Sequence, residues 1–390
     1  MQLNKLAATL AVGLVAPATA LATNGMIMEG YGPIATGMGG ASMAYDNGTA
    51  AMANNPATLG LMANGSRVDV MLGFVGPDLT VPQSPMGPLG ASEADAFYMP
   101  AIGYVKKQDK LAYGVGIYGQ GGMGTEYANG DMAQVSVGRV IFPAAYAVNE
   151  RFNIGGSVDV VWGGMDLVAN LDMIPATKEI DFKDSSDFTG KAKGYSLAAK
   201  LGFTYKLSDA LTVGGVYQTA SNLPDLKDGA WKVEGFDMPP VVGLGFAWQA
   251  TEQLMLAVDV KDVMWGSSMN TVTIRNLETG LVVPFQQDWD DQTVLSLGLS
   301  YKLSKALTGR VGYNHGANPI PDELVNYLWP AIMEDHYTAG FGYAFTPKSE
   351  LNFALSVAPE VTVVGTGPQN TGFTIEHSQV NWQLMYSHKF

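Results

Sequence analysis

The feature that most constrains this chain is an alternation of apolar and polar residues along several segments. Residues 195–206, 295–302, 351–357 and 379–390 show it, and one face of the last segment carries Val380, Trp382, Leu384, Tyr386, His388 and Phe390. A period of two residues predicts β-strands whose two faces meet different surroundings. Beyond residue 22 the chain has no apolar run of about 18 residues, so a protein built from membrane-spanning helices is excluded.

Short polar turns give the number of strands. They lie about 40 to 60 residues apart, which leaves room for two strands and one long loop between neighbouring turns. Alternation alone also fits a soluble β-sandwich, but short turns at one end and long loops at the other are typical of outer-membrane barrels. Six such turns and one further strand at each end predict an all-β, 14-stranded antiparallel transmembrane β-barrel. The turns are at 107–110, 149–151, 208–210, 251–253, 304–306 and 347–350.

The alternation also gives approximate positions. We expect strands near residues 66, 96, 111, 134, 152, 193, 211, 239, 254, 292, 307, 336, 351 and 379. Long loops are expected at 78–95, 169–192, 222–237, 267–290, 317–333 and 359–378.

The first 22 residues differ from the rest of the chain. One early cation, Lys5, precedes an apolar run from Leu6 to Val15 and small residues at Ala20 and Ala22, which is typical of a cleaved secretory signal. We therefore predict that the protein leaves the cytoplasm. The net charge of −14 disfavours nucleic acid as a partner, because the phosphate backbone is itself negative. The absence of cysteine excludes disulfides and thiolate metal sites.

Residues 23–64 do not alternate and are rich in Gly, Ala, Met and Asn. The segment is too short and too poor in strand-forming residues to be a domain. Because it precedes the first strand of a barrel, its protected place is inside the lumen, as a plug. We therefore divide the chain into a signal peptide (1–22), an N-terminal hatch (23–64) and a transmembrane barrel (65–390).

The hatch contains the most specific motif of the chain. A Gly-x-Gly-Gly-Ala core at residues 37–41 is followed by Asp46 and by the triplet Asn55, Pro56 and Ala57. With these residues ahead of the alternating strands, the mature chain resembles the FadL-type outer-membrane transporters of long-chain fatty acids and other hydrophobic compounds. An ordinary Asn-Pro turn is the alternative explanation of the triplet.

The resemblance implies where a substrate binds. It indicates that the first mature residues, here Met26, Ile27 and Met28, lie in a hydrophobic ligand pocket. Methionine thioethers are flexible and fit ligands of varied shape. The alternative is that these side chains only pack the hatch.

The resemblance also implies how a substrate leaves. A kink in the third strand opens a gap in the wall, the Asn-Pro-Ala turn touches this gap, and the substrate passes sideways into the membrane. In this chain the third strand meets Gly119, Gln120, Gly121 and Gly122, and glycines permit backbone angles that interrupt a β-ladder. A loop that begins after the strand is the alternative.

Alternation directs five charged side chains into the lumen, namely Asp159, Lys200, Asp259, Lys261 and Arg310. One of the three cations could pair with a substrate carboxylate. We favour the other interpretation, in which these residues form an ion-pair network that fills a polar barrel interior.

The expected function is therefore passive uptake of hydrophobic compounds by a monomeric outer-membrane channel, with no metal or cofactor. Long-chain fatty acids are the first expected substrates, and aromatic hydrocarbons or alkanes are the alternative. The other expected partners are membrane lipid and the outer-membrane assembly machinery, which would recognise the last strand through Phe390. The loop at 169–192 is short compared with that of the fatty-acid members, which puts their outer capture groove in doubt.

Two rival functions stay open. A general porin or a structural barrel would lack a selective pocket. A barrel hydrolase would need a serine, a histidine such as His315 or His336 and an orienting group, but no histidine sits beside a serine in a nucleophile context. Asp288, Asp290 and Asp291 could bind calcium weakly, although a solvated acidic loop is the expected interpretation.

Overall fold

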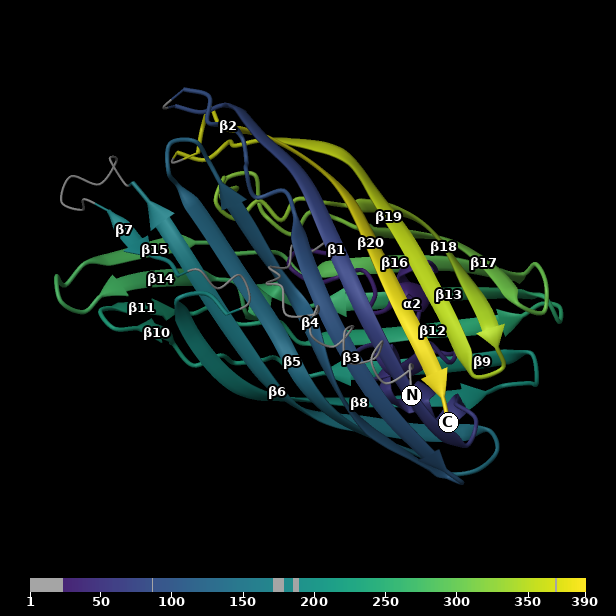
Figure 1. Ribbon diagram of the computed structural model, residues 1–390. Helices are drawn as coiled ribbons and strands as arrows, with labels where there is room; N and C mark the ends of the chain where they lie inside the picture. The colour runs from purple at the N-terminus through teal and green to yellow at the C-terminus, as the bar shows by residue number, and fades with distance from the viewer. Residues whose placement is uncertain (1–23, 86, 171–178, 185–188, 369) are drawn as a thin grey trace, which may run out of the picture.

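The computed structural model describes residues 24–390 except 86, 171–178, 185–188 and 369. The expected signal peptide and part of the loop at 169–192 lie outside the described residues. One antiparallel sheet closes on itself through pairing between its first strand, β1, and its last, β20 (Figure 1). No helix in the described part of the chain is long and apolar enough to cross a membrane.

Fourteen strands form the wall, which confirms the number expected from the turns. Each wall strand pairs with the wall strands before and after it in the chain. In chain order they are β1 (Gly65–Gln83), β3 (Phe97–Gln108), β4 (Leu111–Glu126), β5 (Met132–Ala147), β6 (Phe152–Ala169), β8 (Ala192–Lys206), β9 (Leu211–Gln218), β12 (Val241–Gln249), β13 (Leu254–Val263), β16 (Gln292–Lys302), β17 (Leu307–Gly316), β18 (Asp335–Thr346), β19 (Ser349–Val364) and β20 (Thr374–Lys389).

The long loops contain short strands that the sequence did not predict. They are β2 (Gly90–Ala91), β7 (Ile180–Phe182), β10 (Leu226–Asp228), β11 (Trp231–Glu234), β14 (Thr271–Asn276) and β15 (Val282–Gln286). Two expected loop starts, at 78 and 359, are too early. There β1 and β19 continue to pair with β20 as far as Gln83 and Val364, because β20 is itself long enough to hold both.

The wall strands turn apolar side chains outward, as the alternation predicts. On β20, Val380, Leu384 and Tyr386 are exposed, whereas Asn381 and Met385 are buried. Outward apolar side chains fit a lipid environment, and inward polar ones fit a lumen. The short turns gather at one end of the wall and the long loops at the other (Figure 1).

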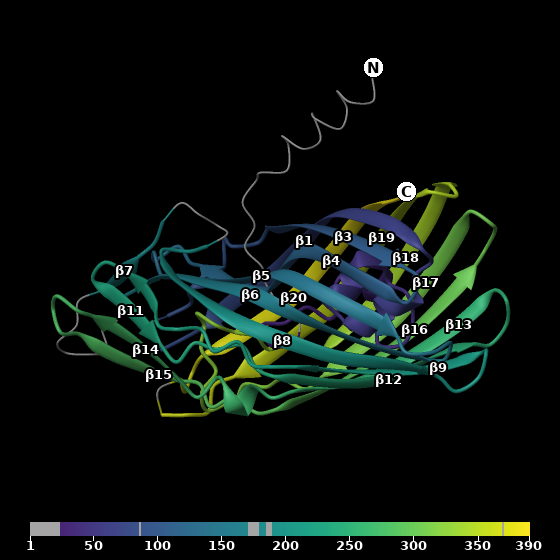
Figure 2. The same cartoon turned by 90° about the horizontal axis from the view of Figure 1, so that it is seen from below.

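The segment before β1 lies inside the barrel (Figure 2). It contains α2 (Pro33–Thr36) and two 3-10 turns, η1 (Gly48–Met52) and η2 (Pro56–Leu61). Within residues 24–62, all are buried except Tyr31, Asp46 and Leu61. Residues 34–62 pack with inward side chains in the short-turn half, whereas residues 26–28 pack in a larger apolar cluster with the long loops.

Candidate functional site

The hatch is held against the wall by close backbone contacts. A Cβ at Gly155 of β6 would lie 2.6 Å from the backbone of Ala57, and a Cβ at Gly312 of β17 would overlap the amide of Gly39. On β13, Asp259 accepts hydrogen bonds from the amides of Ser42 (2.6 Å) and Met43 (3.1 Å). These contacts lie on different parts of the wall, so the hatch is fixed from several sides.

The triplet Asn55, Pro56 and Ala57 begins η2 and ties the hatch to β8. The Asn55 side chain accepts from the amide of Ala57 (3.1 Å) and donates to the carbonyls of Met43 (2.7 Å) and Phe203 (3.2 Å). The triplet therefore caps a turn and anchors it. The turn η2 also contacts β4, the third wall strand, and β5. The expectation that the triplet touches the gap in the wall stays a prediction.

Pairing between β3 and β4 stops part-way along the wall. The two strands pair from the short turn as far as Ile102 opposite Ile117. Beyond that point β3 continues along β1 to Phe97, whereas β4 continues along β5 to Glu126. We call the unpaired stretch, residues 97–101 and 118–126, the window. The glycine-rich segment therefore continues a strand and does not begin a loop.

The glycines of β4 bend the strand inward at the window. The register between β4 and β5 shifts between Gly119 and Gly121, which leaves Gln120 in a β-bulge, and Gly122 resumes the pairing. Residues 120–125 are buried on both faces of the strand. Ile27 forms a β-bridge with Gly121, where a Cβ would overlap the N-terminal backbone. The kink therefore receives the first described residues of the chain.

Side chains fill the window in this structure. The Phe97 ring lies 3.1 Å from the Cβ position of Gly124, and the Met99 sulfur lies 3.4 Å from that of Gly119. At the loop end, the amide of Glu93 donates to the carbonyl of Glu126 (2.7 Å). Side chains therefore close the window, and one of them, Met99, is a flexible thioether.

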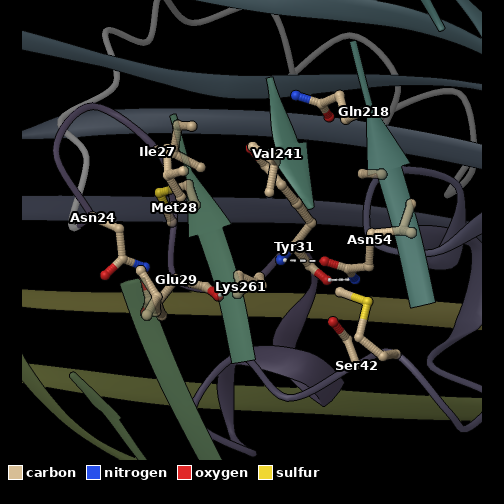
Figure 3. Close-up of a pocket in the computed structure, with 15 residues that line it drawn as sticks. Asn24, Ile27, Met28, Glu29, Tyr31, Ser42, Asn54, Gln218, Val241 and Lys261 are labelled. Carbon is tan, nitrogen blue, oxygen red and sulfur yellow. Dashed lines mark hydrogen bonds between the residues drawn. The ribbon is translucent and has the colours of Figure 1, made fainter. Parts of the chain in front are cut away.

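Two small cavities flank the N-terminal segment. The lumenal cavity, of about 50 Å³, lies inside the barrel (Figure 3). The window cavity, of about 30 Å³, lies between the segment and the window. Benzene fills an apolar cavity of about 150 Å³, so a ligand of that size must displace side chains here. The lumenal cavity is lined by Ile27, Met28, Tyr31, Val216, Val241, Val263 and Val294 with the polar residues Asn24, Glu29, Gln218 and Lys261, among others.

The structure separates the three expected pocket residues. Ile27 and Met28 line the lumenal cavity, and Met28 also lines the window cavity. Met26 is buried in the apolar cluster and lies outside the lining of both cavities.

Tyr31 is a site residue that the sequence did not indicate. Its hydroxyl donates to the carbonyl of Gln120 at the bulge (2.7 Å), and Asn54 holds both its amide (3.2 Å) and its carbonyl (2.9 Å; Figure 3). Burial raises the pKa of the Tyr31 hydroxyl well above its usual range, so this group stays a donor. Tyr31 lies in the non-alternating segment, where the sequence has no period that shows which residues a side chain contacts.

Asp159 and Lys200 form an ion pair of 2.8 Å, and a second cation, Arg139, lies 2.8 Å from the same carboxylate. Arg139 was not predicted from the sequence. Its guanidinium also donates to Gln120 (2.6 Å) and to Ser221 (2.7 Å). All three charged side chains are buried, so they hold the wall and the bulge together and are not available to a substrate.

The remaining expected charges do not join this network. Lys261 donates to the carbonyl of Glu29 (2.9 Å) beside the lumenal cavity. Arg310 donates to Asn352 (3.0 Å) on β19, and Asp259 binds the hatch amides. Hatch and wall groups therefore bind these three charged residues separately from the pair of Asp159 and Lys200.

Histidine pairs occur at both ends of the barrel. At the short-turn end, cross-strand pairing brings Ser349 Oγ to 3.0 Å from His388 Nδ1, a contact between a serine and a histidine that the sequence did not indicate. His315 Nδ1 lies 2.8 Å from Asp335 Oδ1 at the long-loop end. The two pairs are at opposite ends of the wall strands, so they cannot form one catalytic triad. His336 is buried on β18.

The acidic loop residues bind neighbouring protein groups. Asp288 accepts from Gln286 (2.5 Å), and Asp291 accepts from the amide of Gly266 (2.9 Å). No group of three or more possible metal ligands of the His, Cys, Asp or Glu type occurs among the residues that the structure describes.

A larger, polar cavity lies on the short-turn side of the hatch. This vestibule has a volume of about 540 Å³, and its lining includes Asp46, Lys107, Glu150, Lys206 and Asp209. Asp46 is exposed there and accepts a hydrogen bond from the amide of Gly48 (2.9 Å). A path straight along the barrel would therefore lead an apolar molecule into charged surroundings.

Comparison with known proteins adds independent findings. A family model described as outer membrane protein transport protein (OMPP1/FadL/TodX) matches residues 9–381. The structure of the toluene transporter TbuX from Ralstonia pickettii is 27% identical, with 93% of this chain and 99% of that chain covered and a TM-score of 0.77. The toluene transporter TodX from P. putida is 26% identical over the same shares, with a TM-score of 0.80.

A curated relative from Chlorobium limicola is described as an uncharacterized protein in the phosphoenolpyruvate carboxykinase gene 5' region. It is 46% identical over 70 residues, which cover 17% of this chain and 34% of that protein.

Proposed function

The chain belongs to the OMPP1/FadL/TodX family of outer membrane transport proteins, and from this premise we propose that it is a monomeric, passive channel for hydrophobic compounds. In this proposal a compound from outside the cell binds in the lumenal cavity, displaces the side chains of Ile27 and Met28, and leaves sideways through the window. No energy source is needed, because an apolar molecule gains about 0.8 kcal/mol per methylene on leaving water.

The observation that carries the proposal is the end of β3–β4 pairing at a kink that receives the N-terminal segment. The wall is unpaired where the window cavity meets Met99 and Gly119, and flexible side chains close it. The charged vestibule beyond the hatch supports the same proposal. A path along the barrel axis would move an apolar molecule from apolar side chains into a polar, charged cavity, which is unfavourable.

The similarity to toluene transporters supports small aromatic hydrocarbons as substrates. Long-chain fatty acids are the second candidate, and one observation favours them. Lys261 lines the lumenal cavity, where its ammonium group could bind a carboxylate.

A side chain placed in the window tests the side exit. Gly119→Leu is suitable because the Cβ position at Gly119 meets only Met99, at 3.4 Å or more. Gly121 is less suitable, because any side chain there would displace the N-terminal segment. We expect Gly119→Leu to remove most of the uptake of radiolabelled toluene by intact cells, since the leucine occupies the path.

The matched control is Gly309→Leu on β17, where the Cβ position meets only the flexible side chain of Leu303, at 3.4 Å. It should assemble and transport like the native protein. If Gly119→Leu assembles normally and takes up toluene and oleate at the native rate, the side exit is wrong.

A further inference from the structure

The lumenal cavity and the window cavity are separated by two residues. Met28 and Tyr31 line both cavities, and no other described residue does. Any compound that passes from the first cavity to the second must therefore move past one of these side chains.

Tyr31 is also the junction of the two apolar clusters inside the barrel. It packs against the cluster of the long-loop half, which contains residues 26–28, and against that of the hatch, which contains residues 34–62. It is the one described residue placed against both. A turn of its ring would therefore change the contact between the two halves of the lumen.

The backbone and the side chain of Tyr31 are held differently. Asn54 binds both the amide and the carbonyl of Tyr31, so the backbone is clipped to the hatch. The side chain is held by one polar contact, from its hydroxyl to the carbonyl of Gln120 (2.7 Å). One hydrogen bond of ordinary net strength is weak enough to break often, whereas the backbone clip keeps the residue in place.

The other end of this contact is rigid. Gln120 lies in the bulge of β4, and its side chain accepts from Arg139 (2.6 Å), which is itself bound to Asp159 (2.8 Å). The bulge therefore offers a fixed acceptor, so the tyrosine ring is the part of this contact that moves.

We propose that the Tyr31 side chain is the inner gate of the side exit, a role that rests on the function proposed above. With its hydroxyl on Gln120, the ring separates the two cavities. When that bond breaks, the ring turns aside, the cavities join past Met28, and the bound compound moves to the window.

The rate at which a bound compound is released tests the gate. The full chain, in phosphatidylcholine nanodiscs and loaded with naphthalene, is mixed with excess phosphatidylcholine vesicles, and release is followed by stopped-flow fluorescence. Tyr31→Phe should release naphthalene about fivefold faster, the factor expected for one lost hydrogen bond. Tyr31→Ala, which removes the ring, should be faster still.

Tyr45→Phe is the matched control. Tyr45 is another buried hatch tyrosine whose hydroxyl donates to a backbone carbonyl, that of Ala41 (2.5 Å), but it lines neither cavity. Its release rate should equal that of the native protein. Heat-modifiable migration in electrophoresis shows for each variant that the barrel is folded.

Gly119→Leu separates failure of the gate from failure of the side exit, because it should slow release by filling the window. If it does so while Tyr31→Phe releases at the native rate, the exit stands and the gate is wrong. If Gly119→Leu does not slow release, the side exit itself fails. If Tyr45→Phe speeds release as much as Tyr31→Phe, a loosened hatch explains both and the gate is overturned.

Discussion

Two lysines, equally predicted to face the lumen, have different consequences for what the channel can carry. Lys200 is bound to Asp159 at 2.8 Å and is shut off from the cavities, whereas Lys261 lines the lumenal cavity and donates to a single backbone carbonyl, that of Glu29. An ammonium group has three donors, so Lys261 retains capacity for a ligand oxygen. We propose that this capacity separates fatty acids, which carry a carboxylate, from hydrocarbons, which do not.

Lys261→Met should lower the affinity for oleate about tenfold and leave the affinity for toluene unchanged. Only oleate has a carboxylate, so only oleate loses a charge-assisted hydrogen bond in this variant. Displacement of bound naphthalene measures both affinities. Lys200→Met is the control, and should change neither affinity while lowering thermal stability, because it removes one of the two cations that flank Asp159. Equal oleate affinity for Lys261→Met and the native protein would show that this lysine does not recognise a carboxylate.

Alternation predicts that Asp159, Lys200 and Asp259 face the lumen, and all three are buried. It missed Arg139 because the inward face of β5 is apolar around it. Val137 and Ile141 flank Arg139 on that face, and the outward residues Val140 and Phe142 are apolar too. When both faces of a strand are apolar, alternation cannot show which face points into the lumen. Tyr31 was missed for a different reason, since its partners come from distant parts of the chain.

The elements follow from sequence more reliably than the contacts between them. The expected strand starts at 66, 111, 152 and 254 lie within one residue of the observed ones, because polar turns bound them. Loop strands such as β10, of three residues, are too short to show a period. The glycines of the third strand indicated the kink, whereas its partner, the segment at 26–27, lies about ninety residues away and carries no matching pattern.

At the scale of the hatch, deletion of residues 23–58 should leave a folded barrel. The wall closes through β1 and β20 without the hatch, and the carboxylates of Asp69 and Asp259, which now bind hatch amides, would face water. We expect a several-fold rise in ion conductance in planar bilayers and altered uptake of apolar compounds. Gly119→Leu, with its hatch intact, should conduct as little as the native protein. Unchanged conductance after the deletion would show that the hatch does not close the lumen.

The whole molecule combines a closed wall, a hatch fixed from several sides and one stretch of wall without strand pairing. Contacts on β6, β8, β13 and β17 hold the hatch, and the vestibule beyond it is charged. If the hatch stays in place during transport, an apolar compound has one route from the lumen, through the window into the membrane. We therefore predict that transport does not require the hatch to move.

A disulfide that locks the hatch to the wall tests this prediction. The Cβ position of Gly37 lies 3.4 Å from Cβ of Arg310 on β17, close to the spacing that a disulfide needs, and the chain has no other cysteine to interfere. The measurement is the uptake of radiolabelled toluene by cells that carry Gly37→Cys together with Arg310→Cys, before and after reduction. We predict equal uptake in the oxidised and reduced states. Uptake that stops on oxidation and returns on reduction would contradict it.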